Sequence, residues 1–261
     1  MSSTVAIVSD FGQSEYLGIM KGVILAENSS VTLIDLYNHV EPQNVKQAAW
    51  ILEKSFKWFP TGTVFLCVVD PGVGTSRKAV ALETTTNHLM VGPDNGLFWL
   101  LEEKQWIKSC VELPVPACAS ATFHGRDIFA PVAASLSKGT GIADLGKKTT
   151  LTTPLTFTLD SETGSCELVH IDHFGNLITN LSVPEQPAKE YLVHYIDQQA
   201  NRKNLAGLFP FSPTYNLESG QNQDIILIKG SYETFEIAAP DHSAKEQLDL
   251  FIGTILEVKP A

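Results

Sequence analysis

Short continuous apolar runs alternate with segments of helical periodicity along the first half of the chain. The runs Val5–Ser9, Val31–Leu36 and Thr63–Val69 are typical of strands that are buried on both faces. The apolar residues that share one helical side are Leu17, Met20, Val23 and Ile24 in the first intervening segment and Ala48, Ile51, Leu52 and Phe56 in the second. Asn44 can cap the second helix. This strand–helix–strand order predicts a mostly parallel sheet with right-handed crossovers.

The pattern continues with a strand pair and two further helices. Lys78–Glu83 and His88–Val91 read as two strands that are joined by a polar turn. Asp94 or Asn95 can start the helix that follows. A last helix opens within residues 122–127, where a glycine-preceded helix start leaves free N–H groups that favour an anion.

Beyond a linker at residues 147–154 that is rich in Lys and Thr, the chain becomes strand-like and rich in turns. The expected strands are Thr156–Leu159, Cys166–Ile171, Leu177–Leu181, Tyr191–Tyr195, Ile225–Ile228, Phe235–Ala238 and Thr254–Val258, with a short helix near Ala244–Leu250. The sequence therefore predicts an α/β fold in two parts. An N-terminal α/β domain spans residues 1–150, and a mostly antiparallel β domain, a sandwich or a barrel, spans residues 151–261.

Composition narrows the class of protein. The 261 residues are 44% hydrophobic and 18% charged, which is an ordinary composition for a soluble globular protein. The net charge of -11, without a basic cluster, argues against nucleic-acid binding. No apolar stretch approaches the ~20 residues of a membrane span, and the N-terminus lacks a basic targeting segment. The cysteines Cys67, Cys110, Cys118 and Cys166 have no C-x-x-C spacing. We expect buried, reduced thiols in a cytoplasmic protein, with no disulfide and no metal site.

Asp70 is the first candidate for chemistry. It ends the apolar run Thr63–Val69 and is followed by a Pro-Gly-Val-Gly loop, in which Gly72 and Gly74 let backbone approach a ligand closely. Ligands of open α/β sheets bind beyond the carboxyl ends of the strands, which is where Asp70 lies. Asp10 ends the first strand in the same way. A simple turn-capping role is an equally good interpretation of a lone Asp-Pro-Gly.

Three other groups carry polar side chains at turns. Arg77 follows the glycine loop, His124 lies beside Arg126 and Asp127 at a helix start, and residues 172–176 combine a carboxylate, an aromatic ring and an amide. Each group also has a purely structural interpretation. Arg77 can be a solvated loop charge, and His124 can be a capping or core histidine beside a local Arg–Asp pair. Residues 172–176 can form a simple hairpin turn. The glycine loop matches no phosphate-binding motif, and no histidines have a zinc-ligand spacing.

At these residues the sequence resembles the S-adenosylmethionine (SAM) hydroxide adenosyltransferases, which are related to SAM-dependent fluorinating and chlorinating enzymes. The matching segments are Ser9–Gly12, Val69–Gly74 with Arg77, Gly92–Gly96, Phe123–Asp127, Asp172–Asn176, Gly230–Ser231 and Glu236–Ala238. The resemblance implies an N-terminal α/β domain, a C-terminal β-barrel and a homotrimer that binds SAM between subunits. It also implies that water or hydroxide attacks C5′ of SAM, which is the substrate and not a cofactor, and yields adenosine and methionine.

The resemblance also implies individual roles. The family's water-handling Asp, Arg and His match Asp70, Arg77 and His124. The residues that match its substrate-binding positions are Asp10, Phe123, Gly125, Asp172, Phe174, Asn176 and Ser231. Among them, Asp10 and Asp172 match carboxylates that bind hydroxyl groups, and Ser231 matches a serine that contacts the methionine end.

Two departures from the family leave other functions open. Gln43 stands where relatives usually have an aromatic residue, and Tyr232-Glu233 stands where they tend to have Ser-Gly or Arg-Gly. One alternative is a SAM or adenosine binder in which these departures mark a lost activity. Two others are an unrelated hydrolase that uses Asp70 and His124 on another nucleoside, and a halogenase-like enzyme. Halogenating relatives have a tyrosine at the position of Asp70, whose carboxylate would repel a halide, so hydroxide is the better-supported nucleophile.

Overall fold

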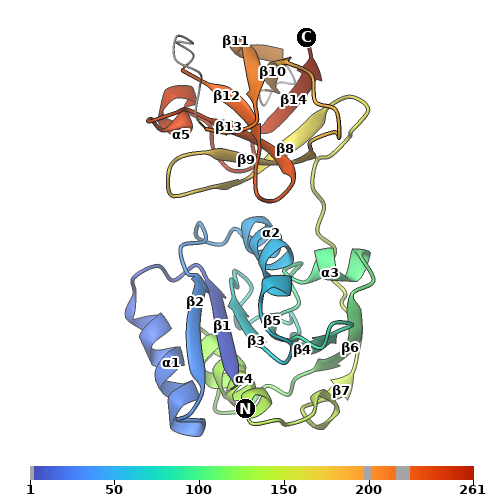
Figure 1. Cartoon of the computed structure of the whole chain (residues 1–261). Coiled ribbons are helices and arrows are strands. Elements are labelled where there is room, and N and C mark those ends of the chain that lie inside the picture. Colours follow the sequence, from blue (N-terminus) through green and yellow to red (C-terminus); the bar gives the residue numbers. More distant parts are fainter. Residues whose placement is uncertain (1–2, 197–201, 216–223) are drawn as a thin grey trace. The chain divides into compact units, whose positions relative to one another are not determined.

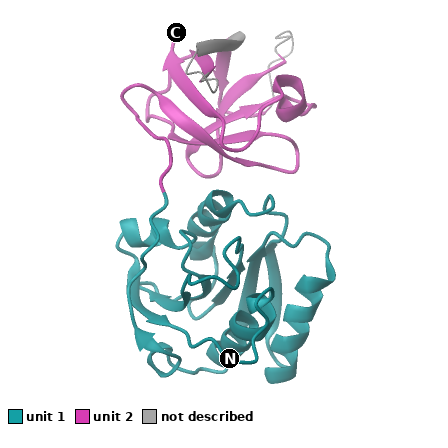
Figure 2. Cartoon of the chain, turned by 180° about the vertical axis from the view of Figure 1, so that it is seen from behind, with its two compact units in different colours: residues 1–155 teal, residues 156–261 magenta. Residues whose placement is uncertain are grey.

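The computed structural model describes residues 3–196, 202–215 and 224–261. The chain divides into two compact units, Met1–Leu155 and Thr156–Ala261 (Figure 2). Each unit has its own hydrophobic core.

The first unit is built on a seven-stranded sheet with the order β2-β1-β3-β5-β4-β6-β7 (Figure 1). Its strands are β1 (Thr4–Ser9), β2 (Thr32–Tyr37), β3 (Val64–Val68), β4 (Ala79–Thr84), β5 (Leu89–Pro93), β6 (Ile107–Glu112) and β7 (Lys147–Lys148). Strands β2, β1, β3 and β5 pair in parallel, whereas β4, β6 and β7 pair antiparallel. The mostly parallel half that the apolar runs predicted is confirmed, and β3 at its centre is entirely buried.

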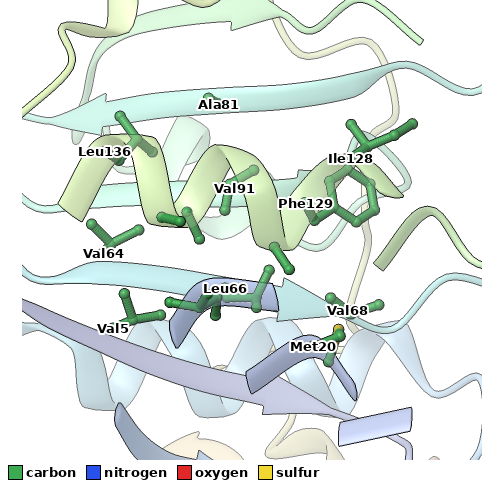
Figure 3. Close-up of a cluster of buried hydrophobic side chains, with 14 of the residues drawn as sticks. Val5, Met20, Val64, Leu66, Val68, Ala81, Val91, Ile128, Phe129 and Leu136 are labelled. Atoms are coloured by element: carbon green, nitrogen blue, oxygen red, sulfur yellow. The ribbon is translucent and has the colours of Figure 1, made fainter. Parts of the chain in front are cut away.

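Helical segments cover both faces of this sheet. They are α1 (Glu15–Glu27), α2 (Val45–Ser55), η1 (Phe56–Trp58), α3 (Trp99–Glu103), the π-helical turn η2 (Gly125–Phe129), α4 (Ala130–Ser137) and η3 (Ile142–Asp144). Met20 of α1 and Phe129 of η2 are buried against one face, in one cluster with Leu66 of β3 and Val91 of β5 (Figure 3). Phe56 of η1 packs edge to face on Phe65 at the other face. The expected cap of α2 is confirmed, because Asn44 Oδ1 accepts a hydrogen bond from Gln47 N at 3.0 Å.

The second unit is a closed barrel with the order β10-β11-β12-β13-β9-β8-β14. Its strands are β8 (Ser165–Ile171), β9 (Leu177–Ser182), β10 (Glu190–Ile196), β11 (Arg202–Ser212), β12 (Ile226–Lys229), β13 (Thr234–Ala238) and β14 (Ile255–Pro260), and its short helix is α5 (Ala244–Leu248). Neighbouring strands pair antiparallel except β11 and β12, which pair in parallel. The structure therefore confirms the antiparallel β domain and selects the barrel.

Several local expectations were wrong. Thr156–Leu159 is not a strand, and the helix expected to start at Asp94 or Asn95 begins only at Trp99. Strand β6 was missed because its alternating sequence Ile-Lys-Ser-Cys-Val-Glu contains no continuous apolar run. Cys118 is exposed, whereas the other three cysteines are buried as expected, and all four are unpaired. Among the described residues, no helix is both long and apolar enough to cross a membrane.

Candidate active site

Asp10 and Asp70 follow two neighbouring parallel strands. Strands β1 and β3 pair in register up to Ser9 opposite Val68, so both carboxylates come directly after the same edge of the sheet. Burial raises the pKa of Asp10, and the charge of Asp70 adds to this effect, although hydrogen bonds from backbone N–H groups oppose it. The strand-end positions inferred from the apolar pattern are therefore correct.

Asp70 and Arg77 form a buried ion pair across the glycine loop. Arg77 Nε donates to Asp70 Oδ1 at 2.9 Å, and Arg77 Nη2 donates to Oδ2 at 2.5 Å. The two side chains are only 6% and 8% exposed, so Arg77 is not a solvated loop charge. The loop itself requires Gly74, which has a φ of 75° and where a Cβ atom would lie 2.3 Å from the carbonyl oxygen of Ala121.

His124 completes a hydrogen-bonded cluster with this pair. Arg77 Nη2 lies 2.7 Å from His124 Nδ1. A guanidinium can only donate, so Nδ1 accepts the hydrogen bond and the ring proton is on Nε2. Burial lowers the pKa of His124, and the positive charge of Arg77 lowers it further, against opposing effects of Asp70 and Asp127. The imidazole is thus held neutral in one tautomer.

One donor of the cluster remains available. Arg77 Nη1 is buried and has no hydrogen-bond partner among the described residues. The guanidinium carbon lies 5.3 Å from the centre of the Phe129 ring, which supports the flat group from one side. Because an unpaired buried donor is costly, Nη1 is suited to bind the oxygen of a ligand.

Phe123 and Gly125 lie on either side of His124. Phe123 packs edge to face on Tyr16, with the ring centres 5.1 Å apart. A Cβ atom at Gly125 would lie 2.9 Å from Met20 Sδ, so a larger residue in the π-helical turn η2 would force the Met20 side chain of α1 to shift.

Arg126 and Asp127 form an ion pair with a structural role, which was one interpretation of the sequence. Arg126 Nε donates to Asp127 Oδ1 at 2.6 Å, and Asp127 Oδ2 accepts the backbone N–H of Ser120 at 2.7 Å. This pair holds the segment that leads into η2.

Asp10 accepts a hydrogen bond from the loop that carries Gln43, one of the positions at which this sequence departs from the pattern of its relatives. Its Oδ2 accepts the backbone N–H of Gln43 at 2.8 Å, and Gln43 has a φ of 67°. The carboxylate therefore fixes this loop through a backbone contact that does not involve the Gln43 side chain.

In the barrel unit, Asp172 and Asn176 lie together in the turn between β8 and β9. Asp172 Oδ1 accepts the backbone N–H groups of Phe174 and Asn176, and Oδ2 accepts Asn176 Nδ2, all at 2.9 Å. The hairpin-turn interpretation is thus correct. The same turn leaves the Phe174 side chain 74% exposed.

Ser231 lies in a different turn, between β12 and β13, and is exposed. An ion pair between Lys229 and Glu233 closes this turn. Glu233 is one of the residues that differ from the pattern of the relatives. Sequence reasoning did not single out the nearby pair in which the Tyr215 hydroxyl donates to Glu236. Burial raises the pKa of Glu236.

The site residues thus form separate sets in the two units. In the first unit, Arg77 contacts both Asp70 and His124 directly. In the barrel unit, Asp172 and Asn176 do so. Within residues 3–196, 202–215 and 224–261, no group of three or more His, Cys, Asp or Glu side chains could hold a metal ion.

Both units match models of one protein family. Residues 5–146 match the SAM hydroxide adenosyltransferase N-terminal domain, and residues 166–257 match the C-terminal domain of the same family. The chain belongs to the SAM hydroxide adenosyltransferase family.

The chain is more similar to a SAM hydrolase than to a fluorinase. The (R)-S-adenosyl-L-methionine hydrolase of Methanocaldococcus jannaschii is 35% identical over 193 residues, which cover 72% of this chain and 70% of that protein. The fluorinase of Actinopolyspora mzabensis is more distant, at 26% identity over 211 residues that cover 68% of this chain and 71% of the fluorinase. The crystal structure of an uncharacterized conserved protein from Thermotoga maritima is similar over nearly the whole chain, with a TM-score of 0.86 and 31% identity, and the match covers 97% of this chain and 99% of that one.

Proposed function

We propose that this enzyme hydrolyses SAM to adenosine and L-methionine. The observation that carries the proposal is the buried cluster of Asp70, Arg77 and His124 beside Asp10, at the carboxyl ends of two central strands in a member of this family. The curated relative with 35% identity is named a SAM hydrolase, which supports the same reaction.

The reaction needs help mainly at the nucleophile. A water oxygen attacks C5′, the C5′–S bond breaks, methionine leaves with the electron pair of that bond, and the attacking oxygen loses one proton. A sulfonium leaves as a neutral thioether, so the leaving group needs no general acid. The developing charges of hydroxide and sulfonium cancel, which a water-poor pocket favours. Holding the oxygen in line with the C5′–S bond supplies much of the remaining acceleration.

The hydrogen bonds favour Asp70 as the proton acceptor. His124 Nδ1 is already occupied by Arg77, and its Nε2 carries the ring proton, so the neutral histidine has no free acceptor. The Asp70 carboxylate has about four acceptor positions and Arg77 uses only part of them. Arg77 Nη1 can stabilise the negative charge of the attacking oxygen.

The remaining site residues bind the substrate in this proposal. Asp10 accepts hydrogen bonds from the ribose hydroxyl groups, and Phe123 and Gly125 shape the wall beside the reacting carbon. From the barrel unit, the turn of Asp172 and Asn176 and the Ser231 turn provide polar contacts to SAM. Phe174, whose ring is exposed, provides an apolar contact to the nucleoside or the amino-acid end.

Incubation with SAM tests the proposal. The purified protein is incubated with each sulfonium epimer, because the relative's name specifies the (R) form, and adenosine is measured by chromatography. Asp70→Asn is the control, since it keeps the shape of the side chain and removes the charge. Adenosine from the wild type and little from the variant supports hydrolysis.

The same assay in chloride or fluoride tests the halogenase alternative. A halogenated deoxyadenosine as the main product would replace the hydrolase assignment, whereas binding of SAM without any product would leave only a binding protein.

We further propose a homotrimer in which sites form between subunits. The observation that motivates it is that the predicted site residues belong to two separate units. Asp70→Ala and Asp172→Ala chains are each expected to be inactive, and mixed assemblies regain activity only if one site uses residues of two chains. Light scattering reports the oligomeric state; a fully active monomer, or mixed assemblies without any recovery, would contradict the proposal.

We propose a cytoplasmic enzyme that needs no cofactor. Its cysteines are all unpaired, which suits a reducing compartment. Fractionation of cells tests the location, and full turnover after exhaustive treatment with a chelator tests the absence of a metal requirement.

A further inference from the structure

The loop at residues 94–98, between β5 and α3, contains two polar residues, Asp94 and Asn95, without a role in the proposed reaction. Asn95 Nδ2 donates to the carbonyl oxygen of Val69 at 2.9 Å, and Val69 directly precedes Asp70. On its other side, Asn95 Oδ1 accepts the backbone N–H of Leu97 at 3.3 Å, which fixes the orientation of the amide. The amide group therefore holds the peptide that carries Asp70.

The same loop holds the other end of the catalytic segment. The backbone N–H of Asp94 donates to the carbonyl oxygen of Lys78 at 2.9 Å, and Lys78 directly follows Arg77. The two residues Asp94 and Asn95 thus bind the chain immediately before Asp70 and immediately after Arg77.

Asp94 is itself firmly held. Its side chain is buried, and Oδ2 accepts both the backbone N–H of Thr152, at 2.9 Å, and the Thr152 hydroxyl, at 2.7 Å. The hydroxyl of Thr153 donates to the Asp94 carbonyl oxygen at 2.9 Å. These bonds tie the loop to the last residues of the first unit, so the loop can act as a fixed support.

We propose that Asn95 is a positioning residue for the Asp70–Arg77 pair. This inference rests on the proposed function, because the pair must orient the attacking oxygen. The Asp70 carboxylate accepts three hydrogen bonds from the Arg77 guanidinium. This geometry is kept only if the backbone before Asp70 and the backbone after Arg77 both stay in place. A misplacement of about 1 Å can cost about 100-fold in rate, so the support is expected to affect turnover more than binding.

Asn95→Asp is the test variant. It has nearly the same shape, but it places a carboxylate oxygen against the Val69 carbonyl oxygen in place of the Nδ2 donor. The expected result at pH 8 is a kcat lowered about 10- to 100-fold with an unchanged affinity for adenosine. On acidification the new carboxyl group is protonated and can donate again, so the ratio of variant to wild-type kcat should rise toward one. Asn87→Asp adds the same charge on an exposed turn and is the control.

A second measurement does not depend on the reaction. Nitrogen-15 NMR of the His124 ring reports which nitrogen carries the proton, and therefore whether Arg77 still donates to Nδ1. We expect Asn95→Asp to change these signals at pH 8 and to restore them in acid. If these ring signals change as expected but the wild-type protein does not hydrolyse SAM, the positioning role of Asn95 stands and the proposed function is wrong.

Two results would overturn the positioning role of Asn95 even if the wild-type protein hydrolyses SAM. One is a wild-type kcat for Asn95→Asp at pH 8 together with unchanged ring signals. The other is a loss of activity that no pH restores, since a purely structural defect predicts no recovery on protonation.

Discussion

Replacing His124 by asparagine and by glutamine separates the roles of its two ring nitrogens. The Oδ1 atom of asparagine is bonded to Cγ just as Nδ1 of histidine is, so asparagine can still accept the hydrogen bond from Arg77. Glutamine places its polar atoms one bond farther out, closer to the position of Nε2. If His124 acts by accepting from Arg77, His124→Asn should retain activity and His124→Gln should not.

The size of the effect follows from one hydrogen bond. Alanine at position 124 removes the 2.7 Å bond to the Arg77 guanidinium in a place where the histidine is only 5% exposed. A hydrogen bond to a charged group contributes about 1.5–3 kcal/mol, and about 1.4 kcal/mol is tenfold in rate. If the whole contribution is expressed in the transition state, kcat for His124→Ala falls about 10- to 150-fold. His124→Asn keeps the acceptor and should stay within about tenfold of the wild type.

The assay is adenosine formation from SAM at saturating substrate, with circular dichroism as a check that each variant is folded. The explanation would be refuted if His124→Gln were the more active of the two variants, or if His124→Asn were as inactive as His124→Ala while folded. Either result would assign the essential role to Nε2.

The same histidine predicts a dependence on pH. Burial and Arg77 hold the pKa of His124 below its ordinary 6.5 in the folded protein, so the unfolded chain binds this proton more readily. The contribution to stability is therefore complete above about pH 6.5 and is lost as the pH falls toward the lower folded value. Protonation also fills Nδ1 and ends the bond from Arg77. We expect an acidic loss of kcat that His124→Asn lacks; identical acid limbs in both proteins would contradict this.

Three further predictions concern packing, binding and reactivity. Gly125→Ala should lower the free energy of unfolding by about 1–3 kcal/mol in urea titrations, because its methyl group overlaps buried Met20, whereas Gly18→Ala on an open helix face should not destabilise the protein. Asp10→Asn should weaken adenosine binding about 10- to 150-fold by calorimetry, and an unchanged affinity would exclude the ribose role. Cys118 should react rapidly with a disulfide reagent in the folded protein, and Cys118→Ser should abolish that fast phase.

The local pattern of the sequence was sufficient for the first half of the fold. Strands β1 and β3 were predicted within one residue, because a strand buried on both faces leaves a continuous apolar run. The bounds of β2 were equally close, but the expectation that it is buried on both faces was wrong, because β2 lies at the edge of the sheet and has no buried residue. The positions of Asp10 and Asp70 followed directly, since each residue terminates such a run. The cap at Asn44 was also local, as its partner Gln47 lies only three residues away.

Pairing between distant segments was beyond this kind of reasoning. Strand β5 inserts between β3 and β4, parallel to one and antiparallel to the other, and no local periodicity encodes that order. The exposure of Cys118 had the same cause, because an apolar neighbourhood in sequence does not decide which side chains another segment covers. The barrel was closed by pairings such as β8 with β14, far apart in the chain.

For the active site, residue types were read from the sequence, whereas their chemistry came from tertiary contacts. The family resemblance pointed to Asp70, Arg77 and His124, but it left open which residue accepts the proton. The bond between Arg77 and His124 joins residues 47 positions apart and decides the tautomer. Asn95, read as a possible helix start, reaches the Val69 carbonyl group across 26 positions. A hydrogen bond depends on positions in space to a few tenths of an ångström, and only the packed sheet brings these groups that close.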